Sequence, residues 1–174
     1  MKKRVSLTLA AFALFVVSGH SVAREISGAI GGTGQGQFTG RIGLGFDWER
    51  SWLRSETGQL TGYWDVGLTH WNGGKDASAR TTLSFAPVFV YEFATRSSVT
   101  PFIEAGVGVS LFSGTRAGER NPGSSFNFED RLGAGVKFAN NDRVGLRVIH
   151  YSNAGLKEPN AGIESYALFY THAF

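Results

Sequence analysis

Several long segments carry an apolar residue at every second position, and this two-residue period is the feature that most constrains the fold. From Ile42 to Trp48, and again in Leu83–Phe93, Ile103–Leu111 and Phe126–Phe138, large apolar residues alternate with small, polar or charged ones, glycine prominent among them. Successive side chains of a strand point to opposite faces, so each segment has one strongly apolar face. A soluble β-sandwich also alternates, but it does not usually place large aromatics opposite glycine and charge in strand after strand. The pattern favours a transmembrane β-barrel with an apolar outer face and a narrow, side-chain-filled interior.

The first 23 residues are set apart from this pattern. Lys2, Lys3 and Arg4 precede an apolar stretch that is too short to span a bilayer as a helix, and Ser21-Val22-Ala23 provides small residues for cleavage. We expect a secretory signal peptide over residues 1–23, with a retained N-terminal anchor as the alternative. The barrel domain then occupies residues 24–174, in which no apolar run is long enough for a transmembrane helix.

The charge balance and the absence of cysteine limit which partners and which kinds of site the chain can have. The chain has 17 Lys+Arg and 14 Asp+Glu, and three of the basic residues lie in the predicted signal, so the remaining chain is balanced. This balance does not favour nucleic acid as a partner. Because the chain has no cysteine, it has neither a disulfide framework nor a thiolate metal site.

The alternation predicts an all-β fold with eight antiparallel strands. We expect them over residues 25–34, 38–49, 58–71, 80–94, 100–112, 124–139, 143–153 and 163–174. With both ends of the barrel in the periplasm, the connections near 34–38, 72–79, 113–123 and 154–162 are extracellular. Those near 50–57, 95–99 and 140–142 are periplasmic, and the first is longer than a periplasmic turn should be. The terminal Phe174, after an alternating strand, resembles the signal that outer-membrane barrels present to their assembly machinery.

Three polar residues lie on apolar faces near the extracellular ends of the last two strands. His150 and Ser152 follow Val144, Leu146 and Val148 in the same phase, and Glu164 shares a phase with Tyr166 and Leu168. A polar side chain facing lipid is costly unless it is paired or functional. Residues i and i+2 of a strand lie about 7 Å apart on one face.

These three residues also match in chemistry. A serine hydroxyl becomes a nucleophile when a histidine takes its proton, and a carboxylate fixes the tautomer of that histidine. Ser152, His150 and Glu164 are therefore candidates for a serine esterase triad. The alternative is that they belong to the interfacial belt and are solvated by lipid headgroups.

Longer motifs give the chain a family resemblance. The segment from His150 through Ser152 and Glu164 to Tyr166 is similar to the C-terminal motif of the lipid A 3-O-deacylases, the PagL family. The resemblance extends over essentially the whole mature chain and includes Leu60–Asp65, Leu83–Phe93, Phe102–Gly106 and Phe126–Arg131.

This resemblance implies an outer-membrane barrel whose esterase site faces the outer leaflet. It assigns Ser152 as nucleophile, His150 as general base and Glu164 as the residue that orients it. It further points to the backbone of Asn153 and, more weakly, Gly155 as oxyanion donors, and to Asn160 and Phe128 as supporting residues. Phe128 is equally well explained as an ordinary lipid-facing aromatic.

The implied reaction hydrolyses the ester at the 3-position of lipid A and releases a 3-hydroxy fatty acid, with no metal or other cofactor. The implied substrate is the lipid A of lipopolysaccharide in the outer leaflet. A homodimer that buries part of the lipid-facing surface is compatible with the sequence but is not required by it. Two other functions stay open from the residues alone, a non-enzymatic barrel serving as an adhesin or structural protein and a lipid A acyltransferase.

Overall fold

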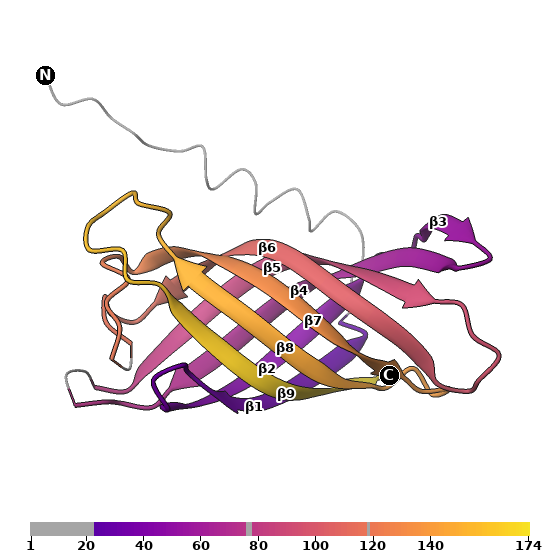
Figure 1. Ribbon diagram of the computed structural model, residues 1–174, viewed down its shortest axis with the longest axis horizontal. Helices are drawn as coiled ribbons and strands as arrows, with labels where there is room; N and C mark the ends of the chain where they lie inside the picture. Colours follow the sequence, from indigo (N-terminus) through magenta and orange to yellow (C-terminus); the bar gives the residue numbers. More distant parts are fainter. Residues whose placement is uncertain (1–22, 76–77, 118) are drawn as a thin grey trace, which may run out of the picture.

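The chain forms a closed antiparallel β-barrel (Figure 1). The structure, a computed structural model, describes residues 23–75, 78–117 and 119–174. Its strands are β1 (Glu25–Gly32), β2 (Phe38–Asp47), β3 (Trp52–Ser55), β4 (Gly58–Trp71), β5 (Arg80–Phe93), β6 (Thr100–Phe112), β7 (Phe126–Lys137), β8 (Arg143–Ser152) and β9 (Ile163–Ala173). Most strands pair with the strands next to them in the sequence. In addition, β1 pairs with β9 and β2 pairs with β4, and these pairings close the barrel. The eight predicted barrel strands are confirmed.

The short strand β3 was not predicted. Trp52–Ser55 forms a hairpin with the start of β4 and stands outside the barrel wall at the right of Figure 1. It occupies the connection that the sequence marked as too long for a periplasmic turn. The predicted signal peptide, apart from Ala23, lies outside the described residues.

The connections gather at the two ends of the barrel (Figure 1). The connections after β1, β4, β6 and β8 lie at one end, which we call the loop end. The connections from β2 to β4, from β5 to β6 and from β7 to β8 lie at the other, the turn end. This distribution agrees with the extracellular and periplasmic sides expected from the sequence.

The outer wall is apolar over most of its area, as the alternation requires. Its exposed side chains include Ile30 on β1, Ile42 on β2, Leu132 on β7 and Leu146 on β8. A cluster of aromatic side chains lies towards the turn end, where Trp48 packs on Trp52, Trp64 and Phe89. Among the described residues, no helix is long and apolar enough to cross a membrane.

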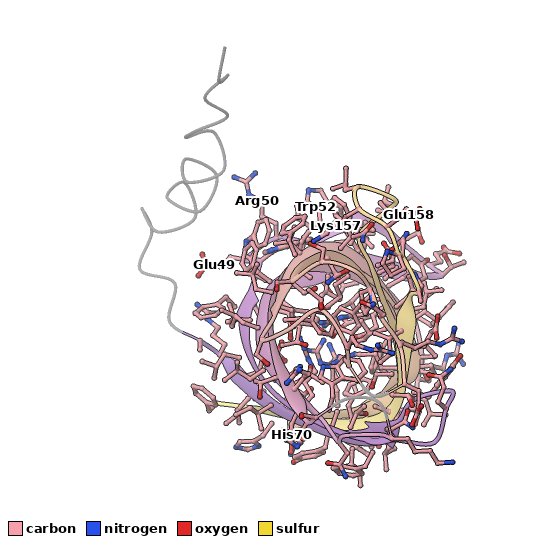
Figure 2. All side chains as sticks on the ribbon, turned by 90° about the vertical axis from the view of Figure 1, so that its left-hand side faces the viewer. Glu49, Arg50, Trp52, His70, Lys157 and Glu158 are labelled. Carbon is pink, nitrogen blue, oxygen red and sulfur yellow. The ribbon has the colours of Figure 1, made fainter. Side chains whose placement is uncertain are left out.

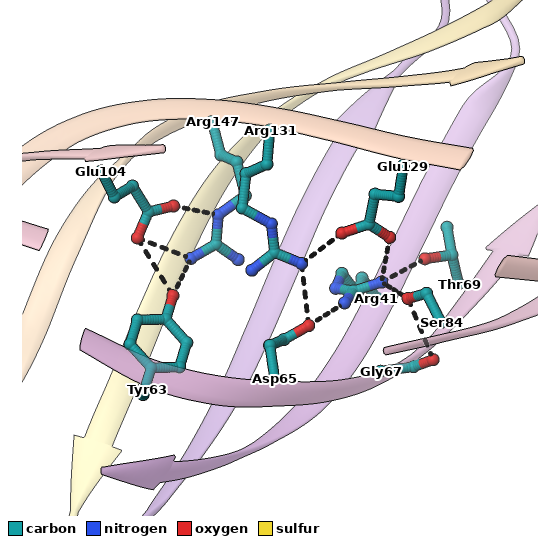
Figure 3. Close-up of polar contacts among 10 residues, drawn as sticks. All are labelled: Arg41, Tyr63, Asp65, Gly67, Thr69, Ser84, Glu104, Glu129, Arg131 and Arg147. Atoms are coloured by element: carbon teal, nitrogen blue, oxygen red, sulfur yellow. Dashed lines mark hydrogen bonds and ion pairs between the residues drawn. The ribbon is translucent and has the colours of Figure 1, made fainter. Parts of the chain in front are cut away.

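Charged side chains fill the middle of the barrel (Figures 2 and 3). Asp65 accepts hydrogen bonds from Arg131, at 2.8 Å, and from Arg41, and Arg131 also donates to Glu129 at 2.6 Å. A second group joins the Arg147 Nε to Glu104 at 2.5 Å, with the Tyr63 hydroxyl donating to the same carboxylate at 3.1 Å. All of these side chains are buried. The buried arginines and carboxylates therefore neutralise one another inside the barrel, as burial in a narrow lumen requires.

An apolar cluster closes the interior at the loop end. We call it the plug, and its members are Trp71, Phe112, Ala117, Ile149, Tyr151 and Ile163. Trp71 and Tyr151 are completely buried and meet edge to face, with ring centroids 5.4 Å apart. The Trp71 indole donates to the Thr82 hydroxyl at 2.8 Å, so its one polar hydrogen is satisfied. The plug gives β8 a firm inner support near its loop-end terminus.

Candidate active site

The loop-end terminus of β8 carries predicted site residues on its outer face and plug residues on its inner face. Ile149 and Tyr151 point inwards and are buried, whereas His150 and Ser152 alternate with them and face outwards. Because the inward residues are locked in the plug, the strand holds His150 and Ser152 on a rigid support. The predicted placement outside the barrel agrees with this register.

His150 lies beside Glu164 on the neighbouring strand. The two residues are direct cross-strand partners, and His150 Nδ1 lies 2.9 Å from Glu164 Oε1. Both side chains are half-buried, with exposed fractions of 38% and 29%. When Nδ1 donates to this carboxylate, Nε2 keeps its lone pair and can accept a proton. The contact thus selects the tautomer that a general base needs.

Ser152 is the last residue of β8 and lies two positions beyond His150 on the same outer face. Its cross-strand partner is Phe128 of β7, which is half-buried and packs edge to face on Phe126 at 5.4 Å. Phe128 therefore forms an apolar wall beside the hydroxyl. The register brings together Ser152, His150, Glu164 and Phe128 from three adjacent strands.

The chain turns sharply directly after Ser152. The Leu156 N–H donates to the Asn153 carbonyl at 3.0 Å, and the two central residues, Ala154 and Gly155, have φ values of 52° and 77°. Two successive left-handed residues are typical of a type I′ turn. None of the backbone hydrogen bonds found between described residues uses the Gly155 N–H. This amide is the freer of the two predicted oxyanion donors.

The other predicted donor, Asn153, is already engaged. Its backbone N–H donates to Asn160 Oδ1 at 3.0 Å, and its fully buried side chain donates to the carbonyls of Pro122 and Lys157 at 2.6 and 2.7 Å. The Asn153 side chain thereby joins the turn after Ser152 to the loop that contains Pro122. The family resemblance implies a role for the Asn153 backbone alone, and the contribution of the side chain is seen only in the structure.

Gly162 contacts His150 and was not singled out from the sequence. A Cβ atom at this position would lie 2.4 Å from Cε1 and 3.0 Å from Nε2 of the imidazole. Only a residue without a side chain leaves room for the ring in its present position. The sequence signal was a glycine two residues before Glu164, which is too common to be informative without the register.

A further carboxylate on the outer wall was also missed. Asp130 of β7 is exposed, and the register places it directly opposite His150. Like His150 and Ser152, Asp130 is a polar residue on an apolar face, because it shares a phase with Phe128 and Leu132. The site therefore contains an ionisable side chain in addition to His150 and Glu164.

Comparisons with known proteins agree with this architecture. Residues 34–173 match the family model described as Lipid A 3-O-deacylase (PagL). The chain is 58% identical over 170 residues to the lipid A deacylase PagL of Pseudomonas aeruginosa, covering 98% of each chain. It is 33% identical over 154 residues to the lipid A deacylase PagL of Bordetella bronchiseptica, covering 80% of this chain and 84% of the relative.

A solved structure extends the likeness to three dimensions. The crystal structure of the outer membrane enzyme PagL superposes with a TM-score of 0.84 at 61% identity, covering 86% of this chain and 99% of the other. Taken with the matched family model, these similarities show that the chain belongs to the lipid A 3-O-deacylase (PagL) family of outer-membrane barrel enzymes.

Proposed function

We propose that Ser152, His150 and Glu164 hydrolyse the ester at the 3-position of lipid A, the reaction of the family to which the chain belongs. The observation that carries this proposal is the 2.9 Å contact between His150 Nδ1 and Glu164 Oε1, beside a serine on the same outer face. This arrangement supplies a nucleophile, a base and an orienting carboxylate in the order that acyl transfer requires.

The chemistry proceeds in two halves. Ser152 Oγ attacks the ester carbonyl as His150 Nε2 takes its proton, and the tetrahedral intermediate then expels the sugar 3-hydroxyl, which receives that proton. In the second half, water attacks the acyl-serine, His150 again accepts and returns the proton, and the 3-hydroxy fatty acid leaves. Glu164 stabilises the imidazolium that forms in each half.

The oxyanion needs donors near Ser152, and the turn that follows the serine offers them. The Gly155 N–H lies in this turn, and the Asn153 N–H becomes available when it releases Asn160 Oδ1. In this proposal the Asn160 oxygen occupies the acceptor position that the substrate oxyanion takes during reaction. Such preplaced donors usually provide a large share of the rate enhancement in acyl transfer.

The position of the site suits a lipid substrate. The three residues lie at the loop end on the outer wall, where the acyl chains and headgroups of the outer leaflet meet water. The C-terminal Phe174 is exposed at the opposite end, after strand β9. We propose that the outer-membrane assembly machinery recognises this terminal strand before the barrel closes.

Mass spectrometry of lipid A from cells expressing the chain tests the proposed function. The wild type should remove one 3-hydroxyacyl chain, and Ser152→Ala and His150→Ala should each lower that conversion by several orders of magnitude. The heat-dependent gel mobility of a folded barrel serves as the control for each variant. An unchanged lipid A with a folded wild-type barrel would refute the proposal, as would full activity of folded Ser152→Ala.

A further inference from the structure

A large apolar groove lies on the outer wall, away from the candidate active site. It has a volume of about 690 Å³, and we call it the β1–β2 groove. Its sides are formed by Ile30 on β1, Ile42 on β2, Leu68 on β4 and Leu168 on β9. None of the described residues that line it belongs to the triad or to β7. The groove is therefore a feature of the wall that the proposed reaction does not use.

Two outward-facing glycines make the wall hollow here. Gly28 lies between its cross-strand partners Ile42 and Tyr170, and Gly40 on β2 also lines the groove. A Cβ atom at Gly28 would have no described atom within 4 Å, and the nearest to one at Gly40 is in the Phe38 ring, at 3.5 Å. Packing within the barrel therefore leaves room for a side chain at both positions.

The inward-facing glycines differ in this respect. A Cβ atom at Gly67 would lie 2.1 Å from Arg41 Nη2, so the interior network requires glycine there. Glycine in a strand interior weakens the strand and often marks a place where a ligand approaches closely. Since nothing inside the barrel explains Gly28 and Gly40, the hollow fits an occupant from outside.

The groove extends from the loop end towards the turn end. It begins at His70 and Thr81, which are cross-strand partners near the end of β4 and the start of β5. It continues to Val144, near the start of β8, and to Tyr170, whose hydroxyl donates to Asp142 in a turn-end connection. The groove thus has the direction of an acyl chain in the bilayer.

His70 and Thr81 give the groove a polar head at the loop end. Both residues are exposed, and the hydrogen bonds and ion pairs found between described residues use neither side chain. Polar side chains on a lipid-facing wall are costly unless they are paired or functional. Both can donate a hydrogen bond, and no acidic residue lines the groove within the described chain. The head is therefore suited to the oxygens of an anionic headgroup.

The head of the groove and the candidate active site lie on opposite sides of the barrel. Figure 2 shows His70 outside the ring of strands, across the lumen from Lys157 and Glu158 of the connection that follows Ser152. Around the closed sheet, three strands separate β4 from β8 in either direction. A lipid whose headgroup lies at His70 is therefore out of reach of Ser152.

We infer that the β1–β2 groove binds an acyl chain of a lipid A molecule, with a headgroup phosphate at His70 and Thr81. The occupant is a lipid because the groove is continuous with the lipid-facing wall, apolar along its length and polar at its head. It is lipid A because the head lies at the extracellular end, where the family to which the chain belongs meets that lipid. This molecule is held and not hydrolysed.

Native mass spectrometry of the folded barrel, released from detergent, tests this inference by counting bound lipids. The probe is a lipid A analogue with ether-linked chains, which no esterase hydrolyses. The wild type should retain one more analogue than Gly28→Ile, because the isoleucine fills the hollow. The affinity of that binding event should fall by about 10- to 100-fold, since lipid chains are already in apolar surroundings and only close contact favours the groove.

Ala134→Ile is the matched control. It adds the same side chain at an exposed position of β7, outside the groove. This variant should retain as many analogues as the wild type, and isoleucine is well tolerated in strands at both positions. Both variants should deacylate lipid A at the wild-type rate, so the result is independent of the test of the triad.

His70→Ala tests the head of the groove. It should weaken binding of the phosphorylated analogue by about 10-fold, the effect of one hydrogen bond to a charged group, and leave an analogue without phosphate unaffected. Equal counts for the wild type and Gly28→Ile overturn the inference, as does equal binding of phosphatidylethanolamine in the groove. A mass of two barrels that is present in the wild type and lost in Gly28→Ile also overturns it, because the occupant is then a second copy of the chain.

Discussion

Single residues around His150 determine how its ring is held. Glu164 fixes Nδ1 from the β9 side, and Gly162 lies against the Cε1 edge. The ring is therefore restrained both by a hydrogen bond and by steric contact. In the proposed mechanism, restraint of this kind keeps Nε2 at the position where it takes a proton from Ser152.

Replacing Gly162 with alanine should slow the reaction far more than it weakens the fold. The new methyl group would overlap Cε1 of His150, so the ring must rotate or the loop must move. A displacement of this size lowers kcat by an amount on the order of 10²-fold, with a smaller effect on KM. Steady-state kinetics on a soluble ester substrate in detergent would measure both constants.

Gly34→Ala provides the control for this substitution. Gly34 lies in the connection after β1, has no atom close to where its Cβ would be, and requires no unusual φ. This variant should keep wild-type kcat. Equal kinetics for Gly162→Ala and Gly34→Ala would show that the contact with His150 does not position the ring.

Among the structural elements, the alternation in the sequence predicts the barrel strands but not the short strand and the loop contacts that are attached to them. It identified the outward phase of β8, and therefore His150 and Ser152, because the pattern there is regular. It gave no indication of β3, since all four residues of Trp52–Ser55 are exposed and have no apolar face to mark them. It also missed the tie between Asn153 and Pro122, because loop-to-loop contacts have no period in the sequence.

One turn-end connection is bonded directly to the last strand. Asp142, between β7 and β8, accepts hydrogen bonds from the Tyr170 hydroxyl and from the backbone N–H of Ala173, and lies 2.9 Å from His172 Nδ1. These contacts lower the pKa of Asp142 from its ordinary value of 3.8 to about 2, with the bond from Tyr170 contributing most. The connection thus fastens β9 next to the point where the barrel closes on β1.

Asp142→Asn should destabilise the barrel at neutral pH, and the difference from the wild type should shrink in acid. A carboxylate with a lowered pKa contributes its full stability above its unfolded value and loses it as the pH falls towards its folded value. The gap between the urea midpoints of the two proteins in detergent should therefore close between about pH 4 and pH 2. A gap that is constant down to pH 2 would assign the effect to shape rather than to charge.

In the molecule as a whole, the interior network and the outer wall have separate roles. The buried arginines and carboxylates hold the strands together from the inside, which leaves the outer wall free to carry the site. Arg131 is central to this division because it bonds to both Asp65 and Glu129 and has no exposed side-chain surface.

Arg131→Met should destabilise the barrel strongly. It removes one of the two arginines that pair with Asp65 and Glu129 and leaves these two buried carboxylates with Arg41 alone. Breaking a buried pair in this way costs about 3–5 kcal/mol. Reversible urea unfolding in detergent measures the change. Arg24→Ala is the matched control, since the pair of Arg24 with Glu49 is exposed and should contribute less than about 1 kcal/mol. Similar losses in both variants would contradict a special role for the interior network.

The plug limits the route by which water can reach the candidate site. With Trp71 and Tyr151 fully buried across the loop end of the lumen, the barrel is no conduit between the two sides of the membrane. In the proposed mechanism, the water that releases the fatty acid from Ser152 must therefore come from the hydrated surface of the outer leaflet. The enzyme can then remodel the lipid barrier around it without itself becoming a leak in that barrier.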